Sequence, residues 1–178
     1  MSTVGSGAVR ASLPAAAQSG WRWLPLALLV IVLDQLVKAW VVQHFHLFER
    51  VHLLPVLDII LTYNTGAAFS FLADAAGWQR WLFVVLALTV SAVLIAWMRR
   101  LRAASQGLLA CGLALIVGGA LGNLIDRLLH GRVVDFVHAH WGEHYFPAFN
   151  VADSAITIGA ALLLVDAFLE NRRGRSGS

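Results

Sequence analysis

Four long apolar runs, separated by short polar segments, constrain this chain more than any other feature of its sequence. They cover residues 24–43, 81–98, 107–125 and 149–169. A helix needs about 20 mainly apolar residues to cross the hydrocarbon core of a bilayer, and each run has roughly that length. Charged residues make up only 13% of the chain, about half of the ~25% typical of a soluble domain. We therefore predict an all-α membrane protein with four transmembrane helices.

The basic residues beside these runs predict how the chain crosses the membrane. Of the 13 lysines and arginines, 8 lie before the first run, between the second and third, or after the fourth. Because Arg and Lys concentrate in cytoplasmic loops, both termini should be cytoplasmic, and segments 44–80 and 126–148 should lie outside. The positive net charge then reflects topology, and no nucleic-acid partner is expected.

A single four-helix domain is expected over residues 23–170. Before it, residues 1–22 are rich in Ala, Gly and Ser and are expected to form a disordered cytoplasmic tail. Residues 171–178 should form a second, short cytoplasmic tail. The folded unit therefore coincides with the four apolar runs and the loops between them.

The first outer segment is expected to fold as more than a connector. HLLPVLDIILTY (52–63) is rich in β-branched residues and contains one proline, which predicts a small extracytoplasmic β element. NTGAAFSFLADAAGW (64–78) predicts a turn at 64–66, followed by a short amphipathic periplasmic helix near 68–76.

Polar residues inside or at the ends of the apolar runs are the candidates for function, because a charge at mid-bilayer costs roughly 2.5–3.5 kcal/mol. Asp34 and Lys38 are four residues apart on one helix face, and a structural ion pair is favoured over substrate contact. At 118–128, GGALGNLIDRL combines small residues that allow close helix packing with Asn123, Asp126 and Arg127. Those three side chains form either a polar pocket near the outer leaflet or, for the arginine, a snorkelling contact with the interface.

FNVADS (149–154) opens the fourth run. Asn150 fits the N-cap of that helix, with Asp153 at its third position. Asp135, in VVDFV, is either a turn residue or the partner of Asp153, and spacing alone does not choose between Asp126 and Asp135 for that partner. Two close carboxylates share a proton, so one can activate water while the other donates to a carbonyl oxygen. Such a pair predicts peptide hydrolysis.

The histidines of the second outer segment raise the alternative of a metal site. His138, His140 and His144 lie near Glu143, and alternating histidines on a strand could bind zinc. The HExxH signature of helical zinc sites is absent, and histidines are common in interfacial loops. We expect neither a metal nor a cofactor to take part in the reaction.

Five motifs together resemble the lipoprotein signal peptidase (signal peptidase II) family: DQLVK at 34–38, NTGAAFS at 64–70, GGALGNLIDRL at 118–128, VVDF at 133–136 and FNVADS at 149–154. The resemblance covers about residues 24–170. It implies that Asp135 and Asp153 form the catalytic pair, with Asp126 as a supporting residue beside Arg127. It also implies a substrate pocket of Asn64, Gly66, Asn123, Arg127 and Asn150. We still interpret Asp34 and Lys38 as structural.

The resemblance further implies an aspartic endopeptidase of the bacterial inner membrane. Its substrate would be a diacylglyceryl-modified prolipoprotein, cut before the lipidated cysteine near the outer leaflet. The enzyme would lie in the phospholipid bilayer, and globomycin would inhibit it. We expect it to work as a monomer. The β element and the short helix would form a platform and a lid over the site. The alternatives are a small proton- or ion-coupled transporter, which should spread charges through the membrane depth, and a non-catalytic assembly subunit.

Overall fold

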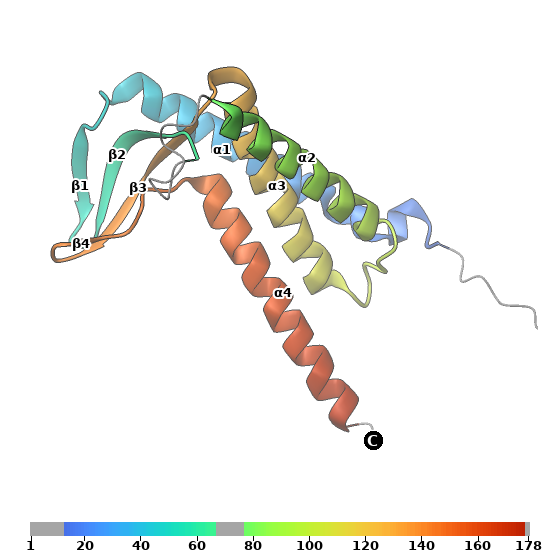
Figure 1. The fold of residues 1–178 in the computed structure, drawn as a ribbon. Coiled ribbons are helices and arrows are strands. Elements are labelled where there is room, and N and C mark those ends of the chain that lie inside the picture. Colours follow the sequence, from blue (N-terminus) through green and yellow to red (C-terminus); the bar gives the residue numbers. More distant parts are fainter. Residues whose placement is uncertain (1–12, 67–76, 177–178) are drawn as a thin grey trace, which may run out of the picture.

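In the computed structural model, which describes residues 13–66 and 77–176, four long helices run through the molecule (Figure 1). They are α1 (Leu24–His44), α2 (Trp78–Met98), α3 (Gly107–His130) and α4 (Val151–Ser176). All four are long and apolar enough to cross a membrane. Large apolar side chains on their outer faces are exposed, as expected for surfaces that contact lipid. The four-span prediction is confirmed.

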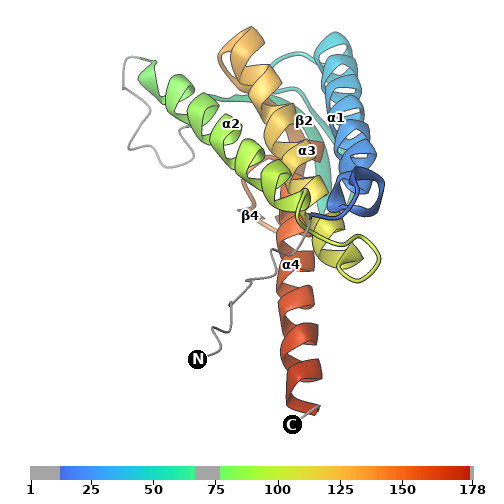
Figure 2. The same ribbon diagram turned by 90° about the vertical axis from the view of Figure 1, so that its right-hand side faces the viewer.

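Helix α3 is the centre of the bundle and lies between α1 and α2 in Figure 2. Within its apolar stretch 56% of residues are buried, against 28% or less in the other three helices. The small residues expected to allow close packing explain this position. A Cβ atom on Gly118 would lie 2.8 Å from the Ala27 carbonyl oxygen of α1, and one on Gly119 would collide with the Ala152 carbonyl oxygen of α4.

A four-stranded antiparallel sheet lies at the end of the bundle where α1 finishes and α4 begins (Figure 1). Its strands, in spatial order, are β1 (Arg50–Leu54), β2 (Leu57–Asn64), β3 (Val133–Trp141) and β4 (His144–Tyr145). The predicted β element is therefore present, but 52–63 is a hairpin that turns at Pro55, because proline suits a turn better than a strand interior. The second outer segment supplies the other two strands.

The opposite end of the bundle joins the N-terminal segment to the α2–α3 connection. Ala16–Gln18 and Gly20–Trp23 form two short 3-10 helices, and the backbone N–H of Gly20 donates to the Leu101 carbonyl at 3.1 Å. The last residues of the expected tail are therefore folded, because Ser19 and Gly20 pack against this connection and are buried.

Helices α3 and α4 extend furthest beyond their apolar runs. Helix α3 continues to His130 rather than ending at 125, and α4 continues to Ser176 rather than 169. Apolar length marks what can sit in hydrocarbon, whereas hydrogen-bonded helix can continue into the interface or water. The short helix and lid expected near 68–76 lie outside the described residues.

Candidate active site

The first turn of α4 holds Asp153 through a reciprocal capping arrangement with Asn150. The Asp153 N–H donates to Asn150 Oδ1 at 2.9 Å, and the Asn150 N–H donates to Asp153 Oδ2 at 3.3 Å. This is the geometry of a capping box, which satisfies two backbone donors at a helix start. The N-cap predicted for Asn150 is thus present, and it fixes where the Asp153 carboxylate lies.

Strand β3 carries Asp135 into the interior beside the start of α4. Its neighbours Val134 and Phe136 belong to a buried cluster with Val41 and Leu61, and Asp135 itself is only 2% exposed. The Val137 N–H donates to the Phe149 carbonyl at 2.8 Å, so β3 and the residue before Asn150 are joined through their backbones. Asp135 is therefore a buried strand residue and not a turn residue.

Asn150 connects the two carboxylates. Its Nδ2 lies 2.7 Å from Asp135 Oδ1, while its other side-chain atom and its backbone N–H hold Asp153. Asn123 completes the arrangement, since its Nδ2 donates to Asp153 Oδ1 at 2.7 Å and its Oδ1 accepts from Asn150 Nδ2 at 3.1 Å. Both amides therefore orient carboxylates.

The surroundings of Asp135 favour its protonated form. Burial away from water is the largest effect, and the negative charge of Asp153 adds to it. Hydrogen bonds from Asn64 and Asn150 act in the opposite direction, and the net result raises the pKa of Asp135 to about 7. A carboxyl group that keeps its proton near neutrality can donate a hydrogen bond that an ordinary aspartate cannot.

Lys38 stands behind this site with all three of its donors used. Its Nζ lies 2.7 Å from Asp34 Oδ2, 2.9 Å from Asp126 Oδ2 and 3.0 Å from Asn123 Oδ1. A lysine ammonium has three N–H groups, so this buried cation is fully satisfied. Asp126, which was expected to be a supporting residue, contributes its carboxylate to this cluster.

The two aspartates on Lys38 also hold the elements that carry the candidate catalytic pair. Asp34 Oδ1 accepts from the Ala152 N–H at the start of α4, at 2.9 Å. Asp126 Oδ2 accepts from the Val134 N–H at the start of β3, at 3.0 Å. Gln35, which the sequence analysis did not select, donates to Asp126 Oδ1 at 2.9 Å. A polar side chain in an apolar run was the signal that could have found it.

The remaining predicted pocket residues line the edge of the site. Asn64 bonds the Asp135 side chain and accepts from the Gly66 N–H at 2.8 Å, closing the predicted turn. Gly66 has a φ of +91°, and a Cβ there would collide with the Phe83 ring. The Arg127 guanidinium lies over the same ring, 4.9 Å from its centroid. It also interacts electrostatically with Asp126, Asp135 and Asp153.

A cleft of about 400 Å³ opens beside Asp135 on the β2–β3 surface. Its lining combines apolar and polar side chains, among them Ile60, Thr62, Asn64 and Pro147. Thr62 is the cross-strand partner of Asp135. The arrangement thus places Asp135, one member of the carboxyl pair, on the wall of a cleft.

The histidines divide into different environments. His138 and His140 lie on β3, where His138 stacks on the Tyr145 ring and His140 is tilted against it. His144, on β4, and Glu143, in the turn before it, are exposed. In the described part of the chain, the structure does not bring together a metal site from His138, His140, His144 and Glu143. His140 lies instead with His52 and Asp58.

Comparisons with known proteins agree with these features. The family model of signal peptidase (SPase) II matches residues 26–169. A lipoprotein signal peptidase of Shewanella sp. (strain MR-4) is 51% identical over 154 residues, covering 86% of this chain and 90% of the relative. One of Pseudomonas fluorescens is 53% identical over 156 residues, covering 86% and 91%. A solved bacterial membrane enzyme superposes with a TM-score of 0.73 at 29% identity, covering 85% and 90%.

Proposed function

This chain belongs to the signal peptidase II family, and from that premise we propose that it removes the signal peptides of diacylglyceryl-modified prolipoproteins by an aspartic mechanism. Family membership makes it a peptidase of bacterial membranes that processes lipoproteins, and sets aside the transporter and assembly-subunit alternatives. The observation that carries the mechanistic proposal is the pair of carboxyl groups, Asp135 and Asp153, held together by Asn150.

In the proposed reaction the two carboxyl groups divide the work. Asp135, whose pKa is raised to about 7, holds the shared proton and donates it towards the carbonyl oxygen of the scissile peptide. The ionised Asp153 accepts a proton from water, whose oxygen forms a bond to the carbonyl carbon. When the tetrahedral intermediate breaks down, the amide nitrogen takes the proton now held on Asp153 and the C–N bond cleaves. A hydroxyl of the intermediate returns its proton to Asp135, which leaves an amine and a carboxylic acid as products.

The pocket residues receive separate proposed tasks. Asn123 and Asn150 orient the carboxylates, because their amide groups already contact them. Arg127, Asn64 and Gly66 bind the substrate backbone at the edge of the site. The cleft along β2 and β3 takes the chain around the scissile bond, while the apolar signal peptide enters laterally between the helices.

The proposed placement in the membrane follows from the two ends of the bundle. Arg99, Arg100 and Arg102 lie at the end joined to the N-terminal segment, which is assigned to the cytoplasm. The carboxyl pair lies with the sheet at the other end, near the outer leaflet. A lipid anchor that stays in that leaflet would hold the scissile bond at a fixed depth, and such positioning can contribute roughly 7–11 kcal/mol to lowering the barrier.

The direct test uses purified protein in detergent with a diacylglyceryl-modified prolipoprotein and excess chelator. Asp135→Asn and Asp153→Asn should each reduce the cleavage rate roughly 10²–10⁴-fold, because each removes a proton-transfer group whose contribution is of that size. Globomycin should inhibit the wild type.

A matched control is Asp166→Asn, which changes an aspartate of α4 outside the site and should keep wild-type turnover. Thermal melting of each variant separates loss of chemistry from loss of fold. Turnover by a folded Asp135→Asn or Asp153→Asn variant would exclude the proposed pair.

A further inference from the structure

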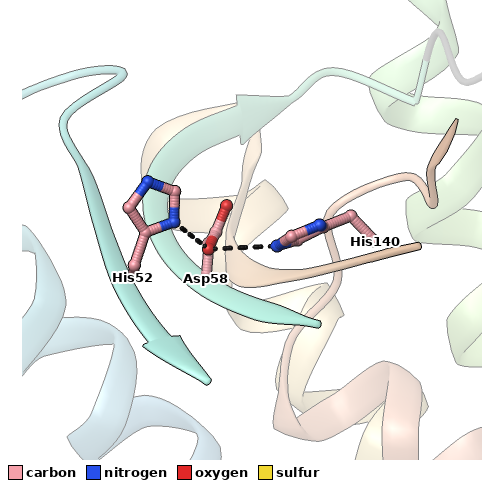
Figure 3. A group of neighbouring side chains, drawn as sticks. All are labelled: His52, Asp58 and His140. Carbon is pink, nitrogen blue, oxygen red and sulfur yellow. Dashed lines mark hydrogen bonds and ion pairs between the residues drawn. The ribbon is translucent and has the colours of Figure 1, made fainter. Parts of the chain in front are cut away.

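Three strands of the extracytoplasmic sheet bring a second group of titratable side chains together, away from the carboxyl pair. His52 lies on β1, Asp58 on β2 and His140 on β3, and Figure 3 shows both imidazoles directed at the Asp58 carboxylate. His52 and Asp58 are direct cross-strand partners. Asp58 is four residues along β2 from Thr62, the partner of Asp135, which is about 13 Å of strand.

The three side chains present one donor atom each at metal-ligand spacing. His52 Nδ1 lies 2.7 Å from Asp58 Oδ1, His140 Nε2 lies 3.3 Å from the same oxygen, and the ligand atoms all lie within 4.8 Å of one another. Around a tetrahedral zinc ion with bonds of about 2.0–2.1 Å, neighbouring ligand atoms are about 3.3 Å apart. A small outward movement of His52 would therefore open the space for one ion.

Unsatisfied buried atoms give an independent reason to expect a ligand here. Asp58 is fully buried, and its Oδ2 has no hydrogen-bond partner among the described residues. The nearest cation, Arg50 Nε, is 3.7 Å from that oxygen. His140 Nδ1 is likewise buried without a hydrogen-bond partner in the described part of the chain, and His140 Nε2 has only its 3.3 Å contact with Asp58 Oδ1. Leaving buried polar atoms unpaired is unfavourable, and a cation bound between Asp58 and His140 would give such atoms a partner.

We propose that His52, Asp58 and His140 bind a single divalent transition-metal ion, with Zn²⁺ as the best match, and that the ion ties β1, β2 and β3 together. Two imidazoles and a carboxylate form a donor set typical of zinc. Three protein ligands leave a fourth position for water. Arg50, close to the other carboxylate oxygen, orients Asp58 from the second coordination shell. The ion is structural, because it lies along the sheet from the proposed catalytic pair.

The test measures zinc directly in the intact protein. The protein is purified through a tag without histidines, stripped with chelator, incubated with two equivalents of ZnSO₄ and desalted, and bound zinc is measured by mass spectrometry. Wild type should retain about one zinc per chain, and its melting temperature should rise with zinc. His52→Ala and His140→Ala should each lower zinc affinity at least tenfold and abolish the thermal shift.

His52 is the decisive variant because its side chain is 76% exposed, so its removal should leave the fold intact without metal. His144→Ala, on the adjoining strand β4, is the matched control and should retain zinc. Retention of less than a tenth of an equivalent by wild type would overturn the proposal, as would equal retention by His52→Ala. Wild type stripped of metal should still cleave prolipoprotein. If wild type binds zinc as proposed but loses cleavage on chelation, the metal-free mechanism is refuted and the zinc site is not.

Discussion

At the scale of single residues, Asn150 joins the local structure of α4 to the geometry of the proposed chemistry. Its Oδ1 caps the helix by accepting from Asp153 N–H, and its Nδ2 contacts Asp135. One side chain therefore sets the relative position of two carboxyl groups that come from different elements. An amide suits this position because it offers both a donor and an acceptor and carries no charge that would alter the pair.

Replacing Asn150 with Ala should damage catalysis more than stability. Loss of an N-cap costs about 1 kcal/mol, whereas misplacing a catalytic group can cost roughly 10²-fold in rate. We therefore expect kcat for prolipoprotein cleavage to fall roughly 10²-fold while the melting temperature falls by only a few degrees.

Thr157→Ala is a suitable control because Thr157 Oγ1 bonds a backbone carbonyl of the same helix on its exposed side. Its kcat should stay near that of wild type. An Asn150→Ala enzyme with normal kcat would show that Asn150 does not position the carboxyl groups.

At the scale of elements, a buried ionic cluster holds α1, α3, β3 and α4 in one arrangement. Lys38 contributes from α1 and Asp126 from α3. Asp34 reaches the first turn of α4, and Asp126 reaches the start of β3. The cluster thus fixes the two elements on which Asp135 and Asp153 lie, which is a structural role consistent with its complete pairing.

Lys38→Met should destabilise the protein strongly, because it leaves two buried carboxylates without their cation. Removing one partner of a buried ion pair costs about 3–5 kcal/mol. Unfolding in mixed micelles should show a loss of this size. The double variant Lys38→Met/Asp34→Asn should recover part of it, since an amide in place of Asp34 carries no unpaired charge. Additive effects of the two substitutions would contradict direct coupling.

Close packing of α3 against α4 sets the depth of the Asp153 turn. Gly119→Ala places a Cβ against the Ala152 carbonyl, which should push the first turn of α4 outward and cost about 1–3 kcal/mol. Both the melting temperature and kcat should fall. Gly107→Ala in the same helix meets nothing closer than 3.9 Å and should be close to neutral. Equal behaviour of the two variants would contradict this packing.

At the scale of the whole molecule, the two ends of the bundle differ in kind. One end carries the 3-10 helices and the arginine-rich α2–α3 connection. The other carries the sheet, the carboxyl pair and the His52–Asp58–His140 group. The arginines from which the orientation was predicted therefore lie at the end of the bundle opposite the sheet.

Single cysteines should report that orientation in intact cells. In a Cys111→Ser background, Glu143→Cys at the exposed β3–β4 turn should react with a membrane-impermeant thiol reagent once the outer membrane is opened. Ser105→Cys, exposed in the α2–α3 connection, should react only after the inner membrane is disrupted. The reverse pattern would place the carboxyl pair on the cytoplasmic side.

The sequence predicted most of what local patterns determine. Apolar length located the four helices, and the Asn150–Asp153 spacing predicted the cap, because both depend on neighbours in the chain. Spacing could not choose Asp126 or Asp135 as the partner of Asp153; the family resemblance made that choice. The reason is physical, since β3 and α4 are brought together by tertiary packing.

Strand register explains what the sequence analysis missed. His52, Asp58 and His140 meet only because β1, β2 and β3 pair with a particular alignment, and a shift of one residue would place their side chains on opposite faces. The same limit applies to Gln35, whose acceptor on Asp126 comes from another helix. Contacts that depend on how distant segments align leave no short pattern in the sequence.

The pH dependence of kcat/KM tests the central claim most directly, because kcat/KM reports ionisations of the free enzyme. If Asp135 must be protonated and its pKa is about 7, kcat/KM for prolipoprotein cleavage should decline as the pH rises through 7, approaching tenfold per pH unit above it. A value that stays level to pH 9, or rises through neutrality, would contradict a proton held on Asp135.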